Sequence, residues 1–105
     1  MTDAFQAKLD EIQVRFILAL DAQRQIVHEA ICSIRTGHNQ EGALRAARLE
    51  LHNIAGTAAI FGFHNLGALA TYCEGRIADP RQDIMELNTI LSGVLDAIDH
   101  IKKTS

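Results

Sequence analysis

Apolar residues recur at three- and four-residue intervals along almost the whole chain, and this spacing limits its fold more than any other feature. The period is that of an α-helix, whose successive turns bring residues i, i+3, i+4 and i+7 onto one face. Only one proline, Pro80, interrupts the 105-residue sequence, and proline is the residue least compatible with a helix interior. The sequence therefore predicts an all-α fold.

The first third of the chain is predicted to be helical up to a clear stop. Its apolar positions run from Phe5 to Ile34 and end before the polar stretch 35–39, in which Gly37 suits a helix C-cap. Asp21 suits an N-cap after a slight break in the pattern. Two helices, or one kinked helix, are therefore expected here.

Three further helical segments follow. One is predicted over about 40–61, and a short turn at 62–65 separates it from a third segment over about 66–77. Asp79 and Pro80 are expected to start the last helix, because aspartate suits the N-cap and proline the first helical position. Helices joined by such short turns pack as antiparallel neighbours.

These helices fit one compact fold. A chain of 105 residues, nearly half of them apolar, is long enough for one core and too short for two ordinary domains. We therefore expect a single domain over residues 1–105, an antiparallel up-and-down four-helix bundle with an additional N-terminal helical segment. One bundle uses the apolar positions without leaving a surplus heptad seam, so a monomer is expected.

Charge and composition argue against several classes of partner. The formal net charge is −3, and Lys and Arg are scattered, which disfavours binding to a nucleic-acid backbone. The N-terminus lacks the basic and apolar regions of a signal peptide, and no uncharged stretch is long enough to span a membrane. A cytoplasmic protein is expected.

Cys32 and Cys73 are isolated and lack metal-ligand spacing, so both are expected to be structural.

His52 stands out on the predicted helix over 40–61. A wheel at about 100° per residue places it roughly 140° from the centre of the apolar stripe, so its side chain is predicted to face solvent. Arg45 and Arg48 precede it on the same arc, and small residues follow where Glu, Lys or Gln would be usual. These small residues are Ala55, Gly56 and Ala59. Because a helical glycine costs about 0.5–1 kcal/mol relative to alanine, the expected gain is access for another protein surface.

Glu74 is the expected partner of His52. Residues equidistant from the turn of a helical hairpin lie level with each other, and His52 and Glu74 are equidistant from Phe63. A carboxylate there would accept a hydrogen bond from the imidazole Nδ1–H and leave the Nε2 lone pair pointing outward. Such a histidine suits a nucleophile that takes up a phosphoryl group, whose charge Arg48 and Arg45 would offset.

An ordinary surface histidine is the alternative to this interpretation. A lone exposed histidine on a helix usually has no special role, and alanine is a good helix former. Glu74 would then be a solvated acid at the flank of its helix. Helix geometry alone favours this alternative.

The stretch HNIAGTAAIFGF, which begins at His52, resembles the signature of histidine-containing phosphotransfer (Hpt) domains. In that signature the active histidine is followed by an apolar residue, a Lys or Ala, a Gly, a Ser or Thr, and a second glycine that closes the helix. The matching positions here are His52, Ile54, Ala55, Gly56, Thr57 and Gly62. The resemblance continues through Leu66 and Leu69 to Cys73 and Glu74, and the helix order of the whole chain looks similar.

The resemblance also assigns neighbours to the histidine. Glu74 stands where such domains often have a glutamine hydrogen-bonded to the active histidine. The lysine that many members carry three residues after the histidine is Ala55 here. Arg48 is the candidate substitute for its charge, and Arg76 is a weaker one.

A phosphorelay is the mechanism that the resemblance implies. His52 Nε2 would attack the aspartyl phosphate of one receiver domain and later yield the phosphoryl group to the aspartate of another. Receiver domains of a hybrid histidine kinase or a response regulator are the implied partners, and the metal ion belongs to the receiver. The chain has no glycine-rich phosphate loop and no P-loop lysine, so a carrier without cofactor or autonomous kinase activity is expected.

Two other functions remain open at this point. A non-phosphorylated adaptor, as in a degenerate Hpt domain, would dock receivers through the face formed by Ala55, Gly56 and Ala59. A metal-binding bundle is less favoured, because the histidines lack the Glu-x-x-His or His-x-x-x-His pairing that places two ligands on one inward face. The histidines concerned are His28, His38, His52, His64 and His100.

Overall fold

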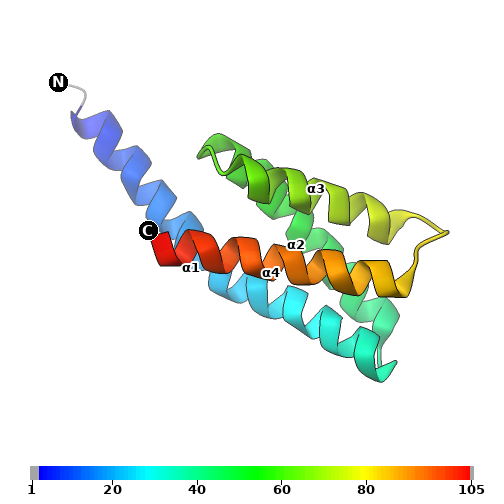
Figure 1. Ribbon diagram of the computed structural model, residues 1–105. Helices are drawn as coiled ribbons and strands as arrows, with labels where there is room; N and C mark the ends of the chain where they lie inside the picture. Colours follow the sequence, from blue (N-terminus) through cyan, green and yellow to red (C-terminus); the bar gives the residue numbers. More distant parts are fainter. Residues whose placement is uncertain (1–2, 105) are drawn as a thin grey trace.

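The computed structural model describes residues 3–104 as a bundle of four α-helices (Figure 1). They are α1 (Asp3–Thr36), α2 (Gln40–Ile60), α3 (His64–Ala78) and α4 (Ile84–Thr104). Each helix packs against the next along the chain, and α4 also packs against α1. The predicted all-α antiparallel bundle is confirmed. Within residues 3–104, no helix is long and apolar enough to cross a membrane.

One apolar core runs between the four helices. Each helix contributes the face on which its periodic apolar residues fall. Fully buried examples, one from each helix, are Leu20, Leu51, Leu66 and Leu91. Burying such a side chain contributes about 1.5–3 kcal/mol, so this face fixes the orientation of each helix. Near the turn between α2 and α3, the ring of Phe16 stacks on Phe61 and Phe63, with centroids 5.6 and 5.8 Å apart, and closes that end of the core.

α1 is one uninterrupted helix of 34 residues, so the expectation of two helices in this region is wrong. Asp21 caps nothing, because it lies inside α1 and its carboxylate pairs with Lys102 of α4. The helix ends before Gly37, as predicted, and this glycine adopts a left-handed φ of 72°. The additional N-terminal segment is the first part of α1 itself, which extends beyond the rest of the bundle (Figure 1).

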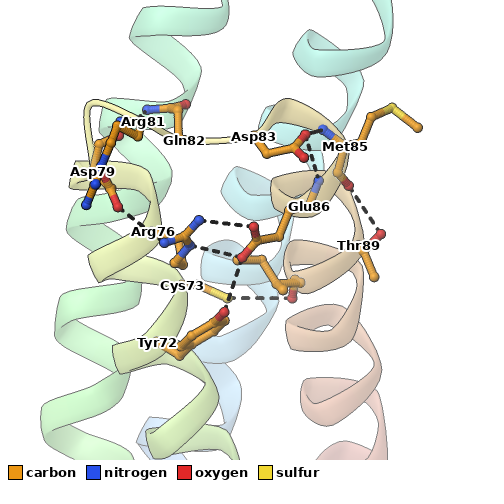
Figure 2. Close-up of polar contacts among 11 residues, drawn as sticks. Tyr72, Cys73, Arg76, Asp79, Arg81, Gln82, Asp83, Met85, Glu86 and Thr89 are labelled. Atoms are coloured by element: carbon orange, nitrogen blue, oxygen red, sulfur yellow. Dashed lines mark hydrogen bonds and ion pairs between the residues drawn. The ribbon is translucent and has the colours of Figure 1, made fainter.

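α4 begins at Ile84, later than the sequence predicts. Asp79 does not cap it, because one oxygen of the Asp79 carboxylate accepts the backbone N–H of Arg81 at 2.8 Å within the connecting loop. Asp83 supplies the cap instead, since its Oδ1 accepts the backbone N–H of Met85 at 2.9 Å (Figure 2). The turn from α3 to α4 is therefore longer than the one inferred from the sequence.

The two cysteines differ in environment. Cys73 is buried, and burial raises the pKa of its thiol to about 12, so it is an unreactive core residue as expected. Cys32 is exposed on α1, and its Sγ lies 3.6 Å from Nε2 of His28. The expectation of a structural role therefore fits Cys73 and not Cys32.

Candidate functional site

His52 lies on the outer face of α2, two turns before the helix ends. Its neighbours Leu51 and Ile54 are fully buried, and their packing fixes the rotation of α2 about its axis. The imidazole is consequently directed away from the core, with its side chain 70% exposed. A second protein can reach this ring without any movement of the bundle.

Glu74 on α3 faces His52 across the hairpin. Its Oε1 lies 2.9 Å from the imidazole Nδ1, and its side chain is only 24% exposed. An ionised carboxylate can only accept a hydrogen bond, so Nδ1 is the donor in this contact, and in the neutral imidazole the lone pair is then on Nε2. The contact also restrains the imidazole through a partner that is itself held against the bundle.

Small side chains surround the ring on the side of the α2–α3 turn. Gly56 is exposed, and a Cβ built on it would have nothing within 4 Å. Ala55 is half-buried and Ala59 is exposed. Together with residues of α3, these two alanines line a shallow groove between the helices. The groove residues are Ala55, Ala59, His64, Gly67, Ala68 and Thr71.

Two glycines of α3 complete this surface and were not singled out in the sequence. A Cβ on Gly67 would lie 3.6 Å from the backbone oxygen of Ala55, so the two helices approach closely along the groove. Gly75 is exposed beside Glu74, and a Cβ added to it would likewise have nothing within 4 Å. Like Gly56, Gly75 is an exposed glycine inside a helix, and this feature could have singled it out as part of the same surface.

The two arginines before His52 differ in their contacts. Arg45 pairs with Glu41 of its own helix at 3.2 Å. Arg48 lies one turn before the imidazole, is exposed, and makes no ion pair within residues 3–104. Of these two arginines, Arg48 is therefore the one whose guanidinium is not engaged in an ion pair among the described residues.

Arg76, the weaker candidate, is held elsewhere. Its Nε and Nη2 donate to the two oxygens of Glu86 at 2.9 and 3.0 Å, and its Nη1 donates to Asp79 at 3.2 Å (Figure 2). The hydrogen bonds to Glu86 raise the pKa of the guanidinium. Arg76 thus ties α3 to α4, and its guanidinium is engaged by these two carboxylates.

The histidines do not assemble a metal site among the described residues. In residues 3–104, no three His, Cys, Asp or Glu side chains are grouped so that they could hold a metal ion. His52 has Glu74 as its partner and His28 has Cys32, and these pairs lie on different helices.

Comparison with protein-family models identifies an Hpt domain over residues 3–103. Comparisons with curated proteins and with solved structures found no match. The family match spans nearly all of the chain, including the hairpin that carries His52 and Glu74. The chain therefore belongs to the Hpt domain family, the phosphocarrier modules of two-component signalling.

Proposed function

We propose that this protein is a phosphorelay intermediate whose phosphoryl group is carried on Nε2 of His52. The observation that supports this most directly is the 2.9 Å contact between Nδ1 and the Glu74 carboxylate on an otherwise exposed ring. In the neutral imidazole this contact assigns the proton to Nδ1, so the Nε2 lone pair is the one that faces an approaching partner. A nucleophile in this state needs no general base within the chain.

The transfer step balances without a further reactant. The Nε2 lone pair attacks the phosphorus of an aspartyl phosphate on a receiver domain, in line with the bond to the aspartate oxygen, and the aspartate leaves as a carboxylate. The phosphorylated ring carries a positive charge, which the hydrogen-bonded Glu74 carboxylate stabilises. When a second receiver aspartate attacks the same phosphorus, the N–P bond breaks and the neutral imidazole returns.

The chain supplies a positioned nucleophile and a docking surface in this proposal. The receiver supplies the metal ion and the reacting aspartate, and the carrier has no kinase activity of its own. The small side chains at Ala55, Gly56 and Ala59 let the receiver approach the imidazole closely, and Arg48 offsets the charge of the phosphoryl group. In this proposal the exposed face around His52 is the one that a receiver domain contacts.

The decisive experiment is transfer from a receiver loaded with acetyl phosphate. Incubation with this chain is expected to place on it a phosphate that is lost in acid and stable in alkali, as a phosphohistidine is. A chain that binds the phosphorylated receiver and acquires no phosphate would refute the proposal and favour the adaptor.

Glu74→Ala is expected to slow phosphate uptake about tenfold, because a hydrogen bond to a charged group is lost and the ring is freed to rotate. Glu74→Gln is expected to slow phosphate uptake less, since the glutamine carbonyl oxygen can accept the same Nδ1–H. Transfer rates are measured by rapid quenching at matched receiver concentrations, with helicity checked by circular dichroism. Wild-type rates in both variants would show that Glu74 does not orient the imidazole.

Arg48→Ala is expected to slow transfer about two- to fivefold, the effect of removing one exposed cation near a developing charge. Arg45→Ala is the matched control, because Arg45 is on the same helix and is already paired with Glu41. Rates measured at low and high salt should converge for wild type and Arg48→Ala as screening increases. A larger decrease in transfer rate with Arg45→Ala than with Arg48→Ala would assign the phosphate contact to Arg45 instead.

A further inference from the structure

The carboxylate of Glu74 has a neutral ring as its partner when the site is ready to react. Its Oε1 lies 2.9 Å from Nδ1 of His52, and the imidazole is the only side chain found to pair with Glu74 within residues 3–104. The Glu74 side chain is 24% exposed, against 70% for His52, so solvent screens the carboxylate only in part. With the imidazole in its neutral, nucleophilic form, the pair therefore carries a net negative charge.

The arginines on the two helices of the hairpin do not pair with Glu74. Arg45 pairs within its own helix at 3.2 Å, Arg76 is held by two other carboxylates, and Arg48 makes no ion pair among the described residues. Two further ion pairs join α1 to α4, and neither involves α2 or α3. When the ring of His52 becomes a cation, Glu74 is therefore the carboxylate that faces it.

Phosphorylation changes the charge of the ring and leaves that of the carboxylate unchanged. When Nε2 forms its bond to phosphorus while Nδ1 keeps its proton, the ring becomes an imidazolium. The aspartate of the receiver leaves with the electron pair of the bond that breaks. The contact between Nδ1 and Glu74 then joins opposite charges, and such a hydrogen bond is stronger than one to a neutral ring. Glu74 therefore stabilises the phosphorylated chain more than the free chain.

A group that stabilises one side of a reversible transfer shifts the equilibrium, whereas a group that only orients the nucleophile changes the forward and reverse rates alike. We propose that the charge of Glu74 shifts the phosphoryl-transfer equilibrium between a receiver domain and this chain toward His52, so that the chain stores the phosphoryl group. This inference rests on the proposed function and adds to it the side on which the phosphoryl group accumulates.

Glu74→Gln separates the charge from the hydrogen bond. Glutamine has the same length, and its carbonyl oxygen can accept the Nδ1–H, but it brings no negative charge to the phosphorylated ring. The equilibrium ratio of phosphorylated chain to phosphorylated receiver is expected to fall about five- to tenfold, because a charge-assisted hydrogen bond is replaced by a weaker one. At about 1 M salt the two proteins should differ less, because both side chains of the pair are in contact with solvent.

Glu50→Gln is the matched control. Glu50 lies on the same helix as His52, about 200° around its axis, and the substitution changes the net charge of the chain by the same amount. Its equilibrium ratio should stay at the wild-type value. The ratio is obtained from rapid-quench transfer rates in the two directions. One direction starts from a receiver loaded with acetyl phosphate, and the other starts from chain that such a receiver has phosphorylated and from which it has been removed.

Two results would overturn the proposal while leaving the relay intact. Equal ratios for wild type and Glu74→Gln would show that the carboxylate orients the ring without shifting the equilibrium. An equal fall in the ratio with Glu50→Gln would assign the effect to the net charge of the chain. The proposed function fails differently, because a chain that exchanges no phosphoryl group with a receiver in either direction would refute the relay and the store together.

Discussion

His52→Gln is expected to abolish phosphate uptake from a phosphorylated receiver. The substitution removes the Nε2 nucleophile, and glutamine offers no lone pair of comparable reactivity. The side chain is 70% exposed, so the free energy of unfolding should change by no more than about 0.5 kcal/mol. The measurement is acid-labile phosphate on the chain after incubation with the receiver, compared with the melting curve of the same preparation.

His38→Gln is the matched control for this variant. His38 is also exposed, it lies in the turn between α1 and α2 and outside the groove beside His52, and no carboxylate partner is found for it within residues 3–104. It should accept phosphate on His52 at close to the wild-type rate. Phosphate uptake by His52→Gln, or an equal loss in both variants, would contradict the assignment of His52 as the acceptor.

The hairpin that carries the site could be predicted because local rules determine it. The apolar stripes of α2 and α3 set the rotation of each helix, and Gly62, with a φ of 80°, closes the turn between them. With rotation and turn fixed, the register follows, and His52 and Glu74 come level at hydrogen-bond distance. No contact distant in sequence was needed for this inference.

The connection between α3 and α4 could not be predicted in the same way. Asp79 and Asp83 are both suitable helix caps, and the Asp79-Pro80 pair is the stronger local signal. Contacts across the fold decide between them, because Arg76 binds both Asp79 and Glu86 and draws the two helices together over a longer loop. Cap propensity is local, whereas this ion-pair network depends on the packed bundle.

How far the core extends along α1 could also not be predicted from the sequence. Periodicity shows that Phe5, Ile12 and Phe16 share a face, and it does not show how far the other helices extend beside them. Phe16 stacks on two rings at the end of the bundle, while no ring contact is found for Phe5 within residues 3–104. A stripe of apolar residues therefore identifies the apolar face of a helix, and it does not identify what packs against that face.

Gly56→Leu is expected to reduce transfer by about a hundredfold or more while making the fold more stable. Leucine favours a helix over glycine by about 0.5–1 kcal/mol, which raises the melting temperature by about 2–6 °C. Apart from the local backbone of α2, no atom lies within 4 Å of a Cβ at this position, so the bundle tolerates the substitution. The new side chain occupies the space through which a receiver reaches the imidazole, and a displacement of about 1 Å costs about a hundredfold in rate.

A graded series distinguishes a blocked approach from damage to the helix. Gly56→Ala should stabilise α2 by a similar amount and slow transfer much less, because one methyl group displaces the receiver less than an isobutyl group. Ala46→Leu places the same leucine side chain at an exposed position of α2 that points away from His52, and it should leave transfer unchanged. Stopped-flow transfer rates and melting curves for the three variants separate a blocked receiver from a damaged helix. Only the approach of the receiver depends on which face of α2 carries the larger side chain. Unimpaired transfer by Gly56→Leu, or an equal loss in Ala46→Leu, would show that receivers do not dock over the small residues beside His52.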